Sequence, residues 1–225
     1  MIRISIIVPV RNEEAVLRTT LERLQPLRAD GHEVIVVDGG SDDASAGIAQ
    51  ALADRTIVAT RGRATQMNAG AAAATGDVLL FLHADSWLPA DAADAIAAAR
   101  SAGGRWGRFD VTIAGRPAIL RVVAWMMNAR SRLTGIATGD QGIFADRAAF
   151  VDAGGYPPIE LFEDIELSWV LKRRVGRPAC LSQRIVTSGR RWERHGPWRT
   201  IVAMWRLRLA YALGADPARL ARRYS

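Results

Sequence analysis

Charged and polar side chains follow three short apolar segments of this chain. Residues 11–13 (Arg-Asn-Glu) follow residues 4–8, Asp38 follows residues 33–37, and residues 83–85 (His-Ala-Asp) follow residues 77–82. Carboxylates can hold a divalent cation or accept a proton, and arginines can bind phosphate groups. The chain has no GxGxxG after the first apolar segment and no GxxxxGK[ST]. We therefore expect side chains and a cation, rather than a glycine-rich loop, to bind any phosphate.

The elements that would position these groups alternate along the first half of the chain. We predict strands at 4–8, 33–37, 56–59 and 77–82, and helices at 13–27, 41–53, 64–74 and 90–99, with Ser41 as the N-cap of the second helix. In the second half we predict strands at 105–114, 141–145 and 179–186. Helices should contain residues 119–126, end at Gly154, and cover 163–175 and 197–213. Such alternation indicates an α/β fold with a parallel sheet, which binds ligands at the carboxyl ends of its strands.

The composition is that of one folded domain. The 225 residues are 49% hydrophobic and 24% charged, and the single cysteine, Cys180, excludes a disulfide scaffold. No segment approaches the roughly 18 apolar residues of a membrane-spanning helix, and the start of the chain lacks the pattern of a signal peptide. We therefore expect a cytoplasmic enzyme or binding domain.

The net charge of +7 is an average over two different regions. Residues 1–171 carry 16 Arg or Lys against 21 Asp or Glu, whereas residues 172–225 carry 14 against 2. The acidic body and the basic tail therefore have net charges of −5 and +12. Such asymmetry indicates an anionic partner or membrane surface, with a merely solvated basic face as the alternative.

The motifs together resemble the family 2 glycosyltransferases with the GT-A fold. Residues 5–13, 36–43 and 76–85 are similar to that family's opening segments, and residues 154–156 with 162–167 are similar to its later GGF…ED block. Residues 62–70 and 139–142 resemble a short bacterial subgroup without transmembrane helices. The resemblance implies an α/β fold of GT-A type, with a mostly parallel central sheet flanked by helices and a C-terminal helical tail.

This resemblance also implies a division of the chain. Residues 1–190 would form the glycosyltransferase domain, with a nucleotide-sugar-binding half at 1–102 and an acceptor and catalytic half at 103–190. Residues 191–225 would form a basic, tryptophan-containing helical tail.

The resemblance assigns the donor site to the first half. The donor would be a UDP- or GDP-sugar, with Mn²⁺ or Mg²⁺ held by Asp85 across its two phosphates. His83 departs from the family's usual aspartate and Gly39 from its usual second acid. The residues expected to bind the nucleotide sugar are Pro9, Arg11, Asn12, Glu13, Asp38, Arg61, Arg63, His83, Ala84 and Asp85. Because Asp38 ends a buried strand, its carboxylate should have a polar partner.

The same resemblance places catalysis at Glu163 and Asp164. Asp164 would act as the general base of an inverting transfer, taking the proton of the acceptor hydroxyl. The acceptor is unknown, with phosphorylated and lipid-linked compounds as alternatives. Its binding, and that of the diphosphate, is expected to involve Asp140, Gln141, Arg190, Arg191 and Trp192. The alternatives to an enzyme of this type are a non-catalytic nucleotide-sugar or membrane-surface binding module and a sugar nucleotidyltransferase.

The segment 197–213 is apolar almost all round. One side carries Trp198, Ile201, Val202, Trp205, Leu209 and Ala212. Much of the other side carries Met204, Leu207 and Tyr211, which leaves Arg199, Arg206 and Arg208 as a thin polar rim. Such a helix fits a core or a homodimer interface, and an in-plane helix at the inner face of an anionic membrane is the alternative. We expect no nucleic-acid partner, because no recognised binding motif accompanies the basic residues.

Overall fold

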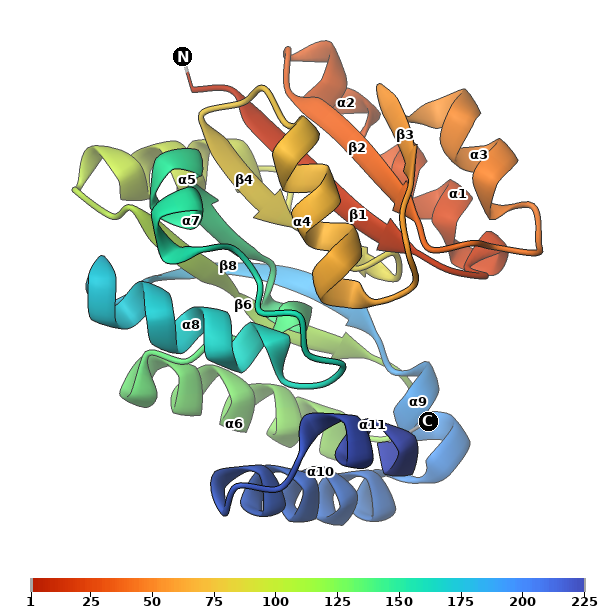
Figure 1. Cartoon of the computed structure of the whole chain (residues 1–225), viewed down its shortest axis with the longest axis vertical. Helices are drawn as coiled ribbons and strands as arrows, with labels where there is room; N and C mark the ends of the chain where they lie inside the picture. Colours follow the sequence, from red (N-terminus) through yellow and green to blue (C-terminus); the bar gives the residue numbers. More distant parts are fainter. Residues whose placement is uncertain (1, 225) are drawn as a thin grey trace.

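A central sheet, which has eight strands among the described residues, organises the molecule (Figure 1). The computed structural model describes residues 2–224. In sequence order the strands are β1 (Ile4–Val10), β2 (Glu33–Asp38), β3 (Arg55–Val58), β4 (Val78–Phe81), β5 (Ser86–Trp87), β6 (Trp106–Ala114), β7 (Ile143–Asp146) and β8 (Ala179–Ser188). In space their order is β3-β2-β1-β4-β7-β6-β8-β5. Four of the seven neighbouring pairs are parallel, which confirms the predicted, mostly parallel sheet.

Helices cover both faces of this sheet. They are α1 (Glu14–Arg23), α2 (Gln25–Ala29), α3 (Ser45–Leu52), α4 (Arg63–Ala73), α5 (Ala92–Ser101), α6 (Ile119–Thr134), α7 (Arg147–Ala153), α8 (Glu163–Arg174), α9 (Arg190–His195), α10 (Pro197–Ala212) and α11 (Pro217–Tyr224), with a 3₁₀ turn, η1 (Gly139–Gln141). The one helix predicted at 13–27 is two helices that meet at Leu24, because Pro26 has no N–H to continue the first. The prediction that Ser41 caps the next helix is wrong. That helix begins at Ser45, and Ser41 donates its hydroxyl to Asp38 instead.

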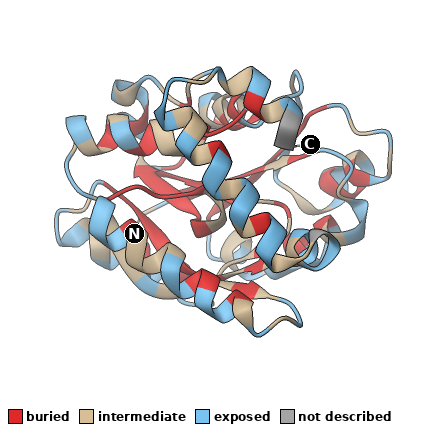
Figure 2. Ribbon diagram, turned by 90° about the horizontal axis from the view of Figure 1, so that it is seen from below, coloured by how far each residue is buried: buried red, intermediate tan, exposed pale blue. Residues whose placement is uncertain are grey.

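The core has two layers because side chains alternate along the buried strands. On β1, Ile4, Ile6, Val8 and Val10 pack with α1, α3 and α5, whereas Ile7 packs on the other face with α4 and α8. All these positions are almost fully buried. Figure 2 shows the same arrangement, with buried strands inside and helices that expose their outer sides.

Strand β5 was not predicted, because two residues give no periodic signal. It pairs with the end of β8, where the hydroxyl of Ser86 donates to Thr187 over 2.9 Å. Next to this pair, the Ser188 N–H donates to the backbone oxygen of Asp85 over 3.1 Å. The pairing therefore fixes the segment that carries Asp85 beside the chain entering α9.

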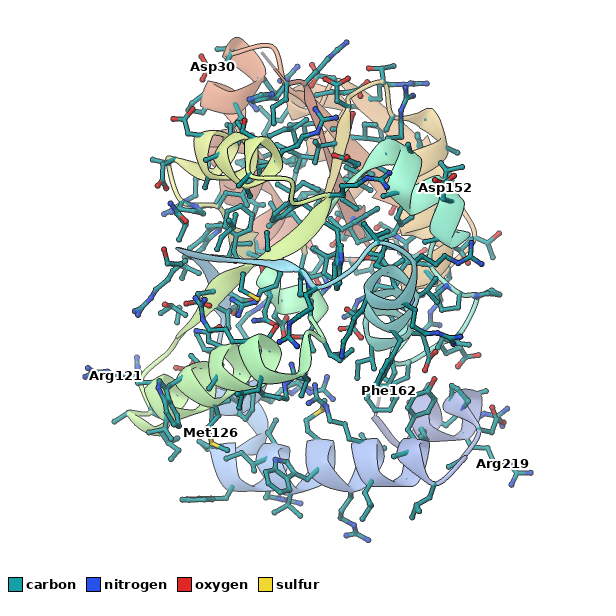
Figure 3. The ribbon with its side chains drawn as sticks, turned by 90° about the vertical axis from the view of Figure 1, so that its left-hand side faces the viewer. Asp30, Arg121, Met126, Asp152, Phe162 and Arg219 are labelled. Carbon is teal, nitrogen blue, oxygen red and sulfur yellow. The ribbon has the colours of Figure 1, made fainter. Side chains whose placement is uncertain are left out.

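The C-terminal helices pack beneath the start of α8. Leu207 of α10 and Leu220 of α11 are buried against Leu161 and Phe162, and the Tyr211 hydroxyl donates to Glu166 over 2.6 Å. Figure 3 labels Phe162 just above α10. Among the described residues, no helix has the length and apolar character needed to cross a bilayer. A division of the chain after residue 190 remains a prediction.

Candidate active site at the carboxyl edge of the sheet

The loops after β1 and β2 are tied to each other. Asn12, whose φ of 54° lies in the left-handed region, donates its N–H to the Ser41 hydroxyl oxygen over 3.0 Å and accepts the Asp42 N–H on its side chain over 2.9 Å. The Ser41 hydroxyl donates to Asp38 over 2.5 Å. Asp38 is only 4% exposed, so the polar partner expected for this carboxylate is present. The two loops form one preorganised rim beside the strand ends.

Gln66 of α4 explains the glycine that follows Asp38. Its side-chain amide donates to the backbone oxygens of Val10 and Val37, each over 2.8 Å, and so joins the ends of β1 and β2. A Cβ added to Gly39 would lie 2.9 Å from this amide. Gly39, which stands where the family usually has a second acid, thus leaves room for the Gln66 side chain. The role of Gln66 could not be predicted, because nothing in a helical pattern indicates which turn of the helix reaches the end of a strand.

Two carboxylates meet at a cationic group near the end of β4. Nη2 of Arg190 lies 3.2 Å from Oδ2 of Asp85 and 3.1 Å from Oε2 of Glu13. Both carboxylates are partly accessible, at 27% and 31% side-chain exposure. Within residues 2–224, no group of three His, Cys, Asp or Glu side chains forms a complete metal site. Asp85 and Glu13 therefore offer carboxylate oxygens, the ligands that Mg²⁺ and Mn²⁺ prefer, at a place where the two side chains already bind the positive charge of Arg190.

A chain of contacts links this region to α8. Nδ1 of His83 lies 3.3 Å from Oδ1 of Asp140, and the neighbouring Gly139 donates its N–H to Oδ2 of Asp164 over 2.8 Å. A Cβ on Gly139 would lie 2.5 Å from Nε2 of His83, so only glycine lets the imidazole approach. The fold therefore brings together His83, Asp140 and Asp164, which the sequence analysis named separately.

The two acids at the start of α8 have different surroundings. Glu163 is 4% exposed, whereas Asp164 is half-buried. Burial, helped by the adjacent carboxylate of Asp164, raises the pKa of Glu163 to about 7; Nη1 of Arg63, at 3.9 Å, opposes this only partly. Near neutral pH, Glu163 therefore holds a proton for much of the time and Asp164 is the more accessible base.

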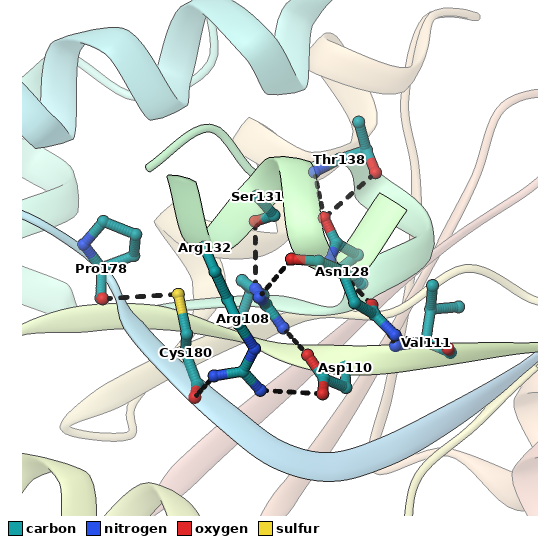
Figure 4. A network of polar contacts seen from close by, with 10 residues as sticks. Arg108, Asp110, Val111, Asn128, Ser131, Arg132, Thr138, Pro178 and Cys180 are labelled. Atoms are coloured by element: carbon teal, nitrogen blue, oxygen red, sulfur yellow. Dashed lines mark hydrogen bonds and ion pairs between the residues drawn. The ribbon is translucent and has the colours of Figure 1, made fainter. Parts of the chain in front are cut away.

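A polar network beneath η1 holds this turn in place (Figure 4). The side chain of Asn128 exchanges two hydrogen bonds with the backbone of Val111 in β6 and also accepts from Gln141 over 3.4 Å. The buried guanidinium of Arg108 pairs with Asp110 nearby. Gln141 is fully buried here, so its side chain supports the turn and does not reach the accessible part of the site.

The other predicted residues are dispersed around the site. Arg11, Arg61 and Arg191 are exposed, and Pro9 is half-buried within β1. Ala84 is buried, and its backbone oxygen accepts from the Thr20 hydroxyl. Trp192 packs in an apolar cluster with Val123 and Ala124 of α6.

Arg130 of α6 is a residue that the sequence analysis missed. Burial, with the positive charge of Arg208, lowers the pKa of Arg130 to about 10, while the nearby Asp164 carboxylate opposes this shift. Among the described residues, its buried Nη2 has no hydrogen-bond partner. A lone arginine in an apolar helix gives no signal in sequence, because its proximity to Asp164 depends on how α6 packs against α8.

The sequence of this chain matches a known protein family. The profile for glycosyl transferase family 2 matches residues 5–146. The undecaprenyl-phosphate 4-deoxy-4-formamido-L-arabinose transferase of Pseudomonas fluorescens (strain Pf0-1) is 34% identical over 170 residues, which cover 67% of this chain and 48% of that protein. The chain thus spans less than half the length of this curated relative.

Solved structures show the same fold. Mannosyltransferase PcManGT from Pyrobaculum calidifontis, in complex with GDP-Man and Mn²⁺, matches with a TM-score of 0.69 and 23% identity over 96% of this chain and 66% of that one. Glucosyl-3-phosphoglycerate synthase from Mycobacterium tuberculosis, in complex with Mn²⁺, UDP and glucosyl-3-phosphoglycerate, matches with a TM-score of 0.66 and 19% identity over 94% and 79%. The predicted GT-A architecture is confirmed.

Proposed function

The chain belongs to glycosyl transferase family 2, and we propose that it transfers a sugar from a nucleoside-diphosphate sugar to a hydroxyl acceptor with inversion at the anomeric carbon. The observation that carries the proposal is the linked set of carboxylates at the carboxyl edge of the sheet. Asp85 lies in the turn between β4 and β5, and the contact of His83 with Asp140, together with the hydrogen bond from Gly139 to Asp164, joins this turn to the start of α8. A donor bound at Asp85 would then present its sugar toward Asp164.

The donor half of the site binds the nucleotide. Asp38 ends β2 and orders the loop after it through Ser41, and the exposed Asn12 lies in the loop after β1; the joined loops form a preorganised rim with hydrogen-bonding groups for a base and ribose. The exposed Arg11 and Arg61 supply positive charge for phosphates. The complexes of related fold with GDP-Man and with UDP support a donor of the UDP- or GDP-sugar class.

Asp85 would hold a divalent cation, with Glu13 as a second carboxylate. Mg²⁺ and Mn²⁺ favour oxygen ligands, and one or two carboxylates suffice when the substrate phosphates complete the shell. The Arg190 guanidinium shows that the two carboxylates can share one cationic group. When bound, the cation neutralises charge on the leaving diphosphate. When the cation replaces the Arg190 guanidinium at the two carboxylates, Arg190 is close enough to bind the diphosphate.

Asp164 acts as the general base. It takes the proton of the acceptor hydroxyl as the oxygen attacks the anomeric carbon, the bond to the diphosphate breaks, and the diphosphate carries away the electron pair. Hydrogen bonds from the N–H groups of Gly139 and Ile165 fix its two oxygens, and its position at the start of α8 stabilises the carboxylate. Glu163 is buried and neutral for much of the time, so it keeps a second negative charge away from Asp164.

We further infer that the acceptor carries an anionic group. Arg130 places a positive charge near Asp164. This charge would attract a phosphate carried beside the acceptor hydroxyl. The similarity to a transferase whose name contains undecaprenyl-phosphate supports a phosphorylated or lipid-linked acceptor.

Two measurements test the proposal. Calorimetry with UDP, GDP and their sugars, with and without Mn²⁺ or Mg²⁺, should show cation-dependent binding that Asp85→Asn removes. Slow hydrolysis of the bound nucleotide sugar should then fall about 10²–10⁴-fold in Asp164→Asn, with nucleotide affinity nearly unchanged. Failure of every nucleotide to bind refutes the donor site, whereas normal binding with normal turnover in Asp164→Asn refutes the assignment of the base. Binding without any turnover in the wild-type chain would favour a non-catalytic module.

A further inference from the structure

Helices α6 and α10 each expose a stripe of large apolar side chains. On α6 it consists of Val122, Trp125, Met126 and Leu133, and on α10 of Trp198, Val202, Trp205 and Leu209. Three tryptophans dominate, since Trp125 and Trp198 are each 69% exposed and Trp205 is 65% exposed. The opposite side of α10, with Leu207 and Thr200, is the side that packs on the protein. The segment is therefore neither wholly core nor wholly exposed.

The two stripes lie on one continuous face, which we call the tryptophan face. The helices run side by side in the same direction in Figures 1 and 3, and Met126 is labelled on this side of α6. Ile119 and Met127 of α6 and Ile201 of α10 pack against one shared apolar cluster. At about 100° per residue, these residues lie about a quarter turn from the stripe of their own helix, in opposite rotational directions on the two helices. Because the helices run parallel and these residues face a shared cluster, the two stripes point to the same side.

The charge around the tryptophan face is of one sign. The sequences of α6 and α10 contain six arginines and no aspartate or glutamate. By the same helical spacing, the exposed Arg121 lies along the outer edge of α6, and the exposed Arg199 and Arg206 along the outer edge of α10. Tryptophan and arginine around an apolar strip is the pattern of helices that lie in the interface of an anionic bilayer.

A second copy of the chain fits this face less well. A symmetric dimer would bring the same patch of each copy together, so the arginine rims would face each other without any acid from these helices to balance them. Anionic lipid headgroups supply that balance, and the acyl boundary accepts the tryptophans. We propose that the tryptophan face binds the surface of an anionic lipid bilayer.

This surface is close to the acceptor side of the molecule. Leu207 of α10 packs on Phe162, which directly precedes α8 and its acids. Only Gly196 separates α10 from α9, whose Arg190 contacts Asp85. Docking by α6 and α10 would hold the start of α8 near an acceptor carried by the membrane. The binding itself does not depend on the transfer reaction.

Vesicle flotation with the full chain tests the proposal. The chain should float with vesicles of phosphatidylcholine and phosphatidylglycerol, much less with phosphatidylcholine alone, and less as salt rises. Trp198→Glu combined with Trp205→Glu should weaken binding by about 100-fold, because two large apolar groups are lost. Arg199→Gln combined with Arg206→Gln should weaken it by about 20-fold.

A matched control comes from Trp169→Glu. Trp169 of α8 is 47% exposed beside Lys172 and is not part of the tryptophan face. This variant should float like the wild-type chain, and circular dichroism should show that all variants remain folded. The proposal is overturned if the wild-type chain does not float with anionic vesicles, or if Trp169→Glu loses binding equally. It is also overturned if sedimentation shows a dimer that the Trp198 and Trp205 changes dissociate.

Discussion

Replacing Glu163 by glutamine should change how the stability of the chain depends on pH. The pKa of the Glu163 carboxyl, about 7, lies well above the ordinary value of 4.5. Between these two values the unfolded chain ionises this side chain while the folded chain keeps it protonated. The free energy of unfolding therefore falls as pH rises from about 4.5 to 7, by about 1.4 kcal/mol per pH unit, and then stays about 3 kcal/mol lower.

Glutamine has the shape of the protonated acid but cannot ionise. Glu163→Gln should match the wild-type chain below pH 4.5, where both side chains are neutral, and exceed it at high pH. Between pH 5 and pH 8 the difference in the free energy of unfolding should grow by roughly 2–3 kcal/mol in favour of the variant. Urea denaturation of the unliganded chain at several pH values measures this difference directly.

Glu160→Gln is the matched control, because Glu160 lies in the loop before α8 and is exposed. Its difference from the wild-type chain should change little with pH. A difference for Glu163→Gln that stays within about 0.5 kcal/mol from pH 5 to pH 8 would refute the claim that burial keeps this carboxyl protonated.

Two further changes test contacts that the structure reveals. Arg190→Ala should raise the affinity of Mn²⁺ for the nucleotide-free chain up to about 5-fold, because the guanidinium no longer competes for Asp85; calorimetry that shows unchanged or weaker binding would contradict this. Gly107→Ala should lower the free energy of unfolding by about 1–3 kcal/mol, since its Cβ would lie 2.3 Å from the backbone oxygen of Ala179. Gly47→Ala, which meets nothing within 4 Å in α3, should instead be neutral or stabilising by up to about 1 kcal/mol, and equal losses in both variants would contradict the packing argument.

Much of the fold could be predicted from local patterns. Continuous β-branched segments indicated the buried parallel strands, and helical spacing indicated most helices, because these periodicities depend on neighbouring residues alone. Two helix boundaries were predicted wrongly for local reasons. Pro26 divides the predicted first helix, and Ser41 is a good cap residue by type but donates its hydroxyl to Asp38, three residues earlier in the chain.

The candidate site, too, could be predicted only in part. The sequence placed Asp38, Asp85 and Asp164 at strand and helix ends, since the carboxyl edge of an α/β sheet collects such groups. It could not show that Arg190, 105 residues further along the chain, contacts Asp85, or that Gln141 is buried in a supporting network. Those contacts depend on how β8 and α6 pack beside the rest of the sheet.

The residue types, their order and the charge asymmetry were fixed by the sequence alone, and they were enough to indicate the family and the kind of chemistry. Only the tertiary structure decided which acid is buried, which arginine meets a carboxylate, and which side of α10 faces solvent. The reason is physical: pKa, pairing and exposure depend on burial and on charges brought together from distant parts of the chain, whereas helical and strand periodicity depends on near neighbours.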